Sequence, residues 1–318
     1  MSTGLADGGG VALDDSAAAR RYRQAEEIYL KLHGLEPIER FVEIQSPAAR
    51  LRVLEVGSGE PVLFVHGTAG AAPVWAPLVH RMKGFRCLML DRPGWGYSSP
   101  IDYSKSEYRS LTVEVLDGLL DALELEHTHI AGGSIGNVWA LALAAARPSR
   151  VGRVVLMGGG PLLPEIPVPG IIKVLASPLG AAMVRMPEKR QRVVSITRGN
   201  GHGRSLDAGR MEEFIDWRTI LGKETPSMRH ERDMVRNLVD KQGWRPGLTF
   251  DNAELAEIQQ PTLYLYGTED PVGSADIWRG AVDQIPRGEL HLLQNFGHMP
   301  WLDDPARVAS DVEEFLKA

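Results

Sequence analysis

The sequence predicts an α/β fold with a mostly parallel, doubly wound sheet and a helical cap inserted after the sixth strand. Three observations predict it. Short apolar runs typical of buried strands end mostly in Gly, Asp or His. Helix-like segments separate most of these runs. This alternation of strand-like and helix-like segments then stops for roughly a hundred residues between LMGGG and PTLYLYG. The 318 residues, 43% of them hydrophobic, suffice for a sizeable core.

The elements are predicted in this order. Residues 1–38 form a tail and an accessory amphipathic helix, because apolar side chains recur at helical spacing after a possible N-cap, Ser16: Tyr22, Ala25, Tyr29 and Leu32. RFVEIQ and RLRVLEVG form an antiparallel hairpin at a sheet edge. The remaining strands are PVLFVHG, FRCLMLD, THIAGG, GRVVLMGGG, PTLYLYG and ELHLLQ.

The interruption in the alternation of strands and helices predicts the domain organisation. Residues 39–160 and 251–318 are the two parts of the core, and 161–250 are a helical cap that opens on a proline-rich stretch. An insertion of this size at the active-site end of a sheet is typical of a cap. A peripheral helical excursion without a role in binding is the alternative.

Composition excludes several classes of partner and site. A formal net charge of −6 gives no general attraction to nucleic acid or to a membrane surface, so a small-molecule substrate is expected. The single cysteine, Cys87, excludes an intrachain disulfide and is expected to be an inert core residue. We expect no cofactor, no metal site, no membrane span and no secretory signal, and we predict a cytoplasmic protein. The oligomeric state stays open.

The stretch THIAGGSIGNVWALALAAARP places Ser134 between a strand and a helix, flanked by Gly132 and Gly136. A sharp strand-to-helix turn lifts a serine oxygen clear of the sheet, and small neighbours avoid collisions there. A serine hydroxyl attacks only when a base removes its proton. Ser134 is therefore a candidate nucleophile, the alternative being an N-capping or phosphate-facing serine of an ordinary βα turn.

The partners of a serine nucleophile are predicted on the last two strand-end loops. His298 follows the last predicted strand and is the candidate base, because only histidine titrates near neutral pH. Asp270 follows the preceding strand and is the candidate acid. Glu269 is its nearest competitor, and the Asp-Pro turn favours Asp270. His66 is expected to brace loops.

Two backbone N–H groups are predicted to stabilise an oxyanion. Ile135 follows the serine directly and supplies one. The glycine-rich loop HGTAGAAPVW supplies the second, with Thr68 as the best donor and Ala69 as the fallback.

An apolar pocket is predicted to receive the substrate. Its expected substrate-contacting residues are Gly67, Ala69, Trp139 and Trp301, the tryptophans being core residues in the alternative interpretation. Met183 and Met186 of the apolar early cap are adaptable contacts. Four cap arginines either pair with a substrate carboxylate or form a solvated face: Arg185, Arg190, Arg192 and Arg198.

The motifs VHG, DRPGWGYS, GGSIG, GTEDP and GHMPW, in this order, resemble the capped serine hydrolases of the α/β-hydrolase superfamily over roughly Arg40 to Ala318. The resemblance implies the order Ser134, Asp270, His298 for nucleophile, acid and base. It also implies oxyanion donors at Thr68 and Ile135. A serine at the elbow argues against epoxide and carbon–halogen chemistry.

A narrower resemblance concerns RVVLMGGGPLLP, which looks like the strand-to-cap passage of carbon–carbon bond hydrolases acting on ring-fission products. HGTAGAAP and GHMPW depart from the corresponding segments of that group. The leading hypothesis is therefore a cofactor-independent serine hydrolase that cleaves an ester or related acyl bond of a small, largely apolar substrate. Carbon–carbon bond hydrolysis of a vinylogous diketone is the second, and a non-catalytic ligand-binding scaffold the third.

Overall fold

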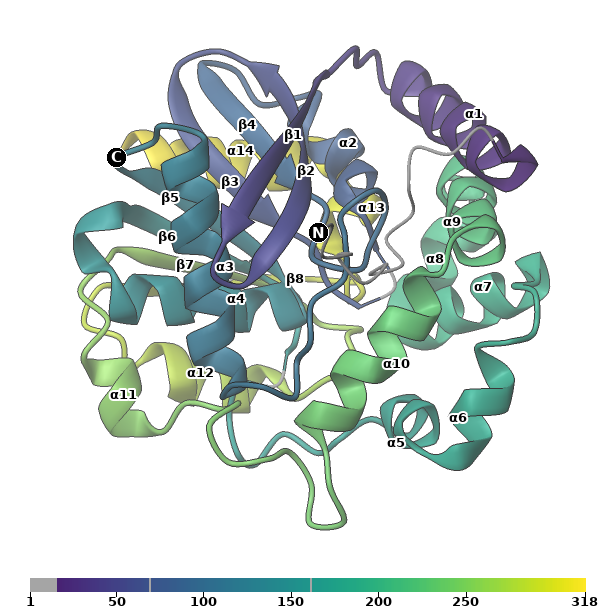
Figure 1. Ribbon diagram of the computed structural model, residues 1–318. Helices are drawn as coiled ribbons and strands as arrows, with labels where there is room; N and C mark the ends of the chain where they lie inside the picture. The colour runs from purple at the N-terminus through teal and green to yellow at the C-terminus, as the bar shows by residue number, and fades with distance from the viewer. Residues whose placement is uncertain (1–15, 69, 161) are drawn as a thin grey trace, which may run out of the picture.

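The structure is a computed structural model that describes residues 16–68, 70–160 and 162–318, so most of the expected N-terminal tail lies outside it. An eight-stranded sheet forms its centre, in the order β1-β2-β4-β3-β5-β6-β7-β8 (Figure 1). Strand β2 is antiparallel to both neighbours, and every other pair is parallel. The strands are β1 Ile38–Gln45, β2 Ala48–Gly57, β3 Glu60–Val65, β4 Phe85–Leu90, β5 Thr128–Gly133, β6 Val151–Met157, β7 Thr262–Gly267 and β8 Gly288–Leu293.

This architecture confirms the predicted α/β-hydrolase fold, with the hairpin at one edge. Side chains alternate across each strand, so Val62 and Phe64 face one apolar core while Leu63 and Val65 face the other. One face of the sheet packs on α3 Tyr108–Ala122, α4 Ile135–Ala146 and α12 Ala275–Val282. The opposite face packs on α2 Ala76–Val79, α13 Pro300–Asp303 and α14 Pro305–Lys317.

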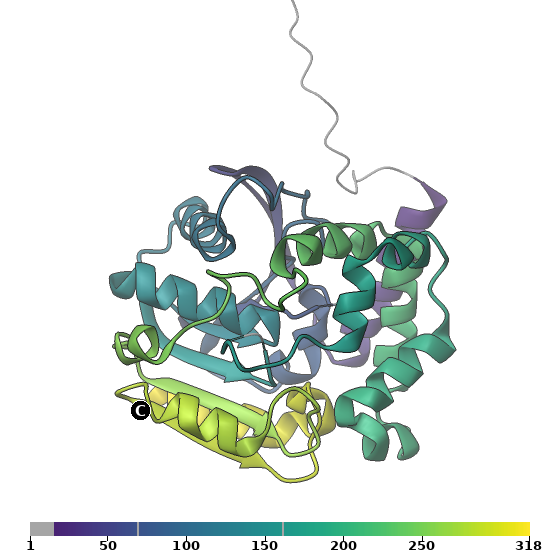
Figure 2. The same ribbon diagram turned by 90° about the horizontal axis from the view of Figure 1, so that it is seen from below.

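Helices between β6 and β7 form the insertion after the sixth strand, and they gather at one end of the sheet (Figure 2). They are α5 Gly170–Ala176, α6 Pro178–Met183, α7 Arg190–Thr197, α8 Gly203–Asp207, α9 Glu212–Glu224 and α10 Ser227–Leu238. A π-helical turn, η3 (Arg198–His202), joins α7 to α8. All fall inside the predicted cap, whose boundaries stay a prediction; Pro161 is outside the described residues. The chain returns to the core through α11 Asn252–Ala256, and the short turns η1 Ala72–Trp75 and η2 Pro148–Arg150 follow β3 and α4.

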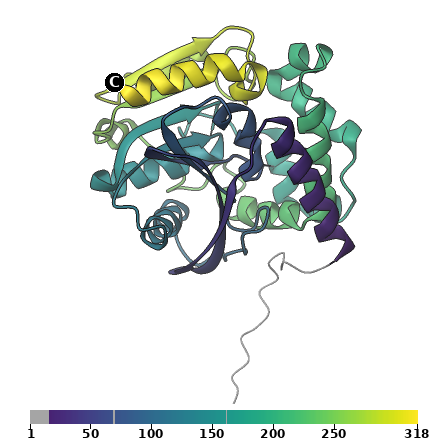
Figure 3. The same cartoon turned by 90° about the horizontal axis from the view of Figure 1, so that it is seen from above.

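The accessory helix is α1, Ala17–Leu32, and the Ser16 side chain accepts the N–H of Ala19 at 3.0 Å, as its predicted N-cap role requires. Its buried face includes Tyr22 and Tyr29, whereas the predicted contact Leu32 is exposed. The helix lies along α9 of the cap (Figure 3), and the Tyr29 ring stacks on Trp217 with centroids 5.1 Å apart. Helix α1 thus contacts the core and the cap together.

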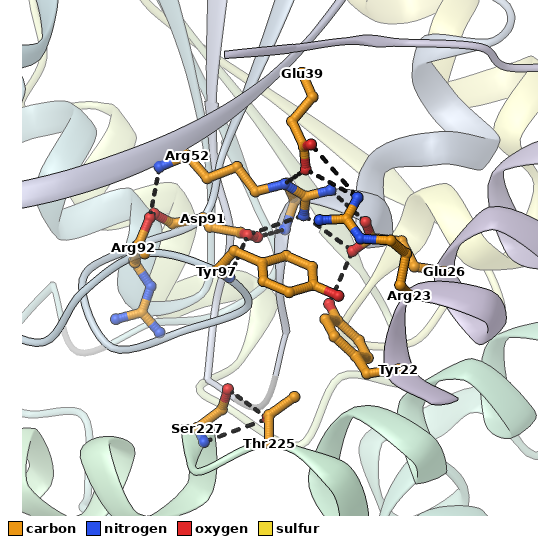
Figure 4. A network of polar contacts seen from close by, with 12 residues as sticks. Tyr22, Arg23, Glu26, Glu39, Arg52, Asp91, Arg92, Tyr97, Thr225 and Ser227 are labelled. Atoms are coloured by element: carbon orange, nitrogen blue, oxygen red, sulfur yellow. Dashed lines mark hydrogen bonds and ion pairs between the residues drawn. The ribbon is translucent and has the colours of Figure 1, made fainter. Parts of the chain in front are cut away.

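A buried ionic network ties α1 to the sheet (Figure 4). Arg52 of β2 donates to Glu26 of α1 at 3.0 Å and to Asp91, just after β4, at 3.1 Å. Tyr22 donates its hydroxyl proton to Glu26 at 2.9 Å. Asp91 also accepts the N–H of Ala72 at 2.7 Å. The network therefore fixes α1 and the loop after β3 against the same arginine.

The structure also tests two predictions about composition. Cys87 lies on β4 with 1% of its surface exposed, and burial raises the pKa of its thiol to about 12, so it stays protonated and inert. Within the described ranges, no helix combines the length and apolar character needed to cross a bilayer.

Candidate active site

Ser134 sits at a strained turn between β5 and α4. Its backbone has φ 55° and ψ −118°, a conformation that non-glycine residues rarely adopt. A Cβ on Gly136 would lie 2.1 Å from the Val65 carbonyl oxygen, so only glycine permits this approach of α4 to β3. The Ser134 N–H donates to the Met157 carbonyl oxygen of β6 at 3.0 Å. The turn has the geometry expected of a nucleophile elbow.

Asp270 and His298 meet on the loops after β7 and β8. His298 Nδ1 lies 2.9 Å from Asp270 Oδ2 and 3.0 Å from Oδ1. Since Nδ1 faces the carboxylate, the other ring nitrogen, Nε2, is left to act on a substrate or nucleophile. Ser134 and His298 line the same cavity, so the three predicted catalytic residues converge there.

The surroundings of Asp270 keep its carboxylate charged. Burial, the largest single influence, raises the pKa of this carboxyl, but the His298 imidazole and the N–H groups of Gly159 (2.7 Å) and Val272 (2.9 Å) together outweigh it. The pKa of Asp270 therefore lies below its ordinary value. Glu269, the competing candidate, is exposed and makes no hydrogen bond or ion pair with His298, whose carboxylate partner is Asp270.

Asp270 has the reciprocal effect on His298. Burial alone lowers the pKa of the imidazole, whereas the charge and the hydrogen bond of Asp270 raise it, and the net shift is upward. An imidazolium formed during a reaction would therefore be stabilised at this position.

The predicted oxyanion donors also border the cavity. Ile135 is the first residue of α4, so its N–H has no partner within the helix. Thr68 and Gly67 also line it. A Cβ on Gly67 would lie 2.9 Å from Ser134 Cβ, which explains why this loop position requires glycine. Ala69 is outside the described residues.

The loop that carries Thr68 is held by a histidine and an arginine. Arg92 donates its backbone N–H to His66 Nε2 at 3.1 Å, so Nδ1 carries the proton and donates to the Gly67 carbonyl oxygen at 2.8 Å. The Arg92 guanidinium donates to the same carbonyl at 3.0 Å. The predicted bracing role of His66 is confirmed. Arg92 also pairs with the buried Glu231 of the cap helix α10 at 3.3 Å.

The cavity has a volume of about 510 Å³ and lies between the strand ends and the cap. Its apolar walls come mainly from the cap, in agreement with the expected apolar pocket: Val168, Ile172, Leu175, Met183, Val193, Met234 and Leu238. Met186 is exposed and does not line it.

The two tryptophans predicted as substrate contacts differ in position. Trp301 lines the cavity and packs against Trp75 in a tilted arrangement, with ring centroids 4.2 Å apart. Trp139 does not line the cavity, so its predicted substrate contact is wrong. It is fully buried and donates its indole N–H to the Tyr108 hydroxyl at 2.8 Å. Trp139 lies one helical turn into α4, on the face that packs against α3, which the spacing from Ser134 alone does not reveal.

Three charged side chains of the cap line the cavity: Glu188, Arg192 and Arg218. Arg192 of α7 donates to Glu188 at 2.7 Å, and Arg218 of α9 lies 3.9 Å from the same carboxylate. Two guanidinium groups thus share one carboxylate and leave one positive charge in excess. The three other cap arginines named as candidates are exposed: Arg185, Arg190 and Arg198.

Sequence reasoning did not identify Arg218, Glu188 or Glu231. The alternation of charged and apolar residues in α9 could have indicated that a cationic side chain is buried. The sequence does not show that this side chain borders the cavity. The described residues contain no group of His, Cys, Asp and Glu arranged to hold a metal ion.

Comparison with known proteins identifies the family. Residues 60–305 match the family described as the alpha/beta hydrolase fold. The chain is 31% identical over 288 residues to a 2-hydroxy-6-oxononadienedioate/2-hydroxy-6-oxononatrienedioate hydrolase of Cupriavidus pinatubonensis, covering 87% of this chain and 94% of the relative. It is 29% identical over 281 residues to a 2-hydroxymuconate semialdehyde hydrolase of a Pseudomonas species, covering 86% and 93%.

Solved structures show the same fold. The carboxylesterase CesB from Bacillus subtilis superposes with a TM-score of 0.71 at 20% identity, covering 95% of this chain and 99% of that one. The meta-cleavage product hydrolase CumD from Pseudomonas fluorescens superposes with a TM-score of 0.71 at 21% identity, covering 87% and 97%. With the strained elbow and the sheet order, these matches establish that the chain belongs to the α/β-hydrolase fold family and is a hydrolase of that superfamily.

Proposed function

We propose that the protein hydrolyses a carbon–carbon bond beside a ketone in a small substrate that carries a carboxylate. The observation that carries this proposal is a charged cluster in the wall of a largely apolar cavity, where Arg192 and Arg218 exceed Glu188 by one positive charge. A substrate carboxylate would neutralise that excess. The names of the relatives support the proposal, because a dienedioate bears two carboxylates.

The proposed reaction uses Ser134, His298 and Asp270 together. Ser134 Oγ adds to the ketone carbon while His298 Nε2 takes its proton and Asp270 stabilises the resulting imidazolium. The N–H groups of Ile135 and Thr68 stabilise the oxyanion. The carbon–carbon bond then breaks, its electron pair goes to the dienol fragment, and that fragment takes the proton from His298. Water, activated by His298, finally releases the acid from Ser134.

Ester hydrolysis by the same residues is the second candidate. The segments HGTAGAAP and GHMPW, which depart from those of ring-fission hydrolases, favour it. The apolar cap wall would then receive the acyl group, and roughly 25 cal/mol per Å² of buried apolar surface would favour medium or aryl acyl chains over acetate. Under either chemistry, the proposed cap of residues 161–250 selects the substrate.

Steady-state kinetics on two substrate series tests the proposal. A 2-hydroxy-6-oxo-dienedioate should be turned over with a kcat/KM well above that of any p-nitrophenyl ester from acetate upward. The reverse order would establish the ester hypothesis. Reaction of Ser134 with a fluorophosphonate probe, lost in Ser134→Ala, separates both enzymes from a non-catalytic scaffold.

A further inference from the structure

The backbone of the segment that carries His298 is held by an unusual set of acceptors. The N–H of Gly297 donates to Asp303 Oδ2 at 2.8 Å, and the N–H of His298 donates to the Asn200 carbonyl oxygen at 2.9 Å. The N–H of Met299 donates to His202 Nε2 at 3.1 Å. Asn200 and His202 belong to the cap turn η3, so the cap accepts two of these three consecutive N–H groups.

His202 connects two of these acceptors. Its side chain is fully buried, and Nδ1 lies 2.9 Å from Asp303 Oδ2. Because Nε2 accepts the Met299 N–H, the proton of the neutral ring must be on Nδ1, which donates to Asp303. Ser205 of α8 donates to the other Asp303 oxygen at 2.6 Å. This second His–Asp pair joins the cap to the core directly beside the candidate catalytic pair.

Two glycines allow the turn η3 to pack closely against the loops that carry Asp270 and His298. A Cβ on Gly297 would lie 2.6 Å from the Asn200 carbonyl oxygen. Gly201 has φ +86°, and a Cβ there would lie 2.2 Å from the carbonyl oxygen of Glu269, the neighbour of Asp270. The turn η3 therefore touches the loop of the acid and the loop of the base together.

We propose that His202, held by Asp303, is a positioning residue that sets the place of His298 relative to Ser134 and Asp270. The proposal rests on the proposed role of His298 as the base. A catalytic group displaced by about 1 Å can lose on the order of 10²-fold in rate. Because η3 is part of the cap, the cap contributes to the geometry of the triad as well as to the cavity wall.

The test compares His202→Phe with His230→Phe, using p-nitrophenyl butyrate as the probe substrate. Phe fills the site but offers neither the donor to Asp303 nor the acceptor for Met299. His230 is a half-buried cap histidine on α10 that makes no hydrogen bond with residues 297–299, so its variant controls for general damage to the cap. We expect His202→Phe to lower kcat about 10- to 100-fold with KM within twofold, and His230→Phe to keep both.

A conservative replacement separates hydrogen bonding from packing. His202→Gln keeps one donor and one acceptor, so its kcat should exceed that of His202→Phe. Equal kcat values for these two variants, a wild-type kcat for His202→Phe, or an equal loss in His230→Phe would overturn the proposal.

Ser205→Ala provides a milder test if His202→Phe does not fold. It removes one hydrogen bond to Asp303, and kcat should fall roughly two- to fivefold, as expected for one bond. An unchanged kcat would contradict the positioning role. Ser134→Ala and His298→Ala are measured in parallel to keep the two proposals apart. If these two variants retain turnover, the catalytic assignment is wrong. If they lose turnover while the His202 and Ser205 variants retain it, only the positioning role is wrong.

Discussion

Asp270 and His298, which follow the adjacent parallel strands β7 and β8, meet at 2.9 Å. Parallel neighbours present their carboxyl ends at the same edge of the sheet, so two loops far apart from Ser134 in sequence converge on the end of β5. The pairing lowers the pKa of Asp270 and raises that of His298, which makes the pair a charge-stabilising unit.

The first prediction concerns the triad as a unit. Ser134→Ala and His298→Ala should each lower kcat by about 10³-fold or more, because neither residue can transfer the nucleophile's proton alone. Thermal unfolding should change little. Measured kcat and Tm for both variants check this, and folded variants with nearly full activity would refute the assignment.

The second prediction is a pH dependence. His298 must be neutral to accept a proton, and its pKa is raised above the ordinary value, so activity should fall as pH drops through a pKa above about 6.5. Asp270→Asn removes the charge that raises this pKa and should move the acidic limb to lower pH while reducing kcat. The kcat/KM–pH profiles of wild type and variant measure both effects. Glu269→Gln is the matched control, because Glu269 is exposed. A large loss of activity in this control would mean that Asp270 is wrongly assigned as the acid.

The third prediction separates the two substrate classes by charge. Arg192→Gln should raise KM for a carboxylate-bearing dienedioate, typically by about tenfold or more for a lost charged hydrogen bond, and leave KM for an uncharged p-nitrophenyl ester nearly unchanged. Arg190→Gln is the control, because Arg190 is exposed and pairs with Asp216. Equal changes in KM for both substrates would show that Arg192 does not bind the substrate carboxylate.

Much of the core and the three catalytic candidates were predictable from local signals. The strands are short apolar runs. Ser134 follows β5 directly, and Asp270 and His298 lie in the loops after β7 and β8, so topology places all three at one edge. Ser16 likewise marks the start of α1 correctly, because an N-cap depends only on neighbouring N–H groups.

Features that depend on distant contacts were not predictable. Arg52 looks like an outward position of an alternating strand, yet Glu26 and Asp91, both far away in sequence, allow it to be buried. His202 has no sequence signal, because its partners Met299 and Asp303 lie about a hundred residues away. Trp139 was misplaced because helical spacing does not specify which neighbour an apolar side chain meets.

The fourth prediction follows from the position of Trp139. Trp139→Ala should lower the free energy of unfolding by about 3–5 kcal/mol, as large-to-small changes of buried aromatic residues do, and should leave substrate preference among folded molecules unchanged. Trp301→Ala should alter preference as well, since Trp301 lines the cavity. Denaturant unfolding and a p-nitrophenyl ester series separate the outcomes, and a changed chain-length preference in Trp139→Ala would restore it as a substrate contact.

The fifth prediction concerns the network that anchors α1. Glu26→Gln leaves the buried Arg52 with one strong partner fewer, and breaking a buried ion pair typically costs about 3–5 kcal/mol. Tm should therefore fall by several degrees. Glu27→Gln on the exposed face of the same helix is the matched control and should change Tm little, because an exposed charge contributes little to stability.

Helix α1 also packs on α9, which carries Arg218. The Glu26 variant should therefore raise KM for the dienedioate by a larger factor than it lowers kcat. A Tm equal to that of the control would show that Asp91 and Glu39 pair Arg52 adequately without Glu26, and that α1 is held by its apolar contacts with Trp217.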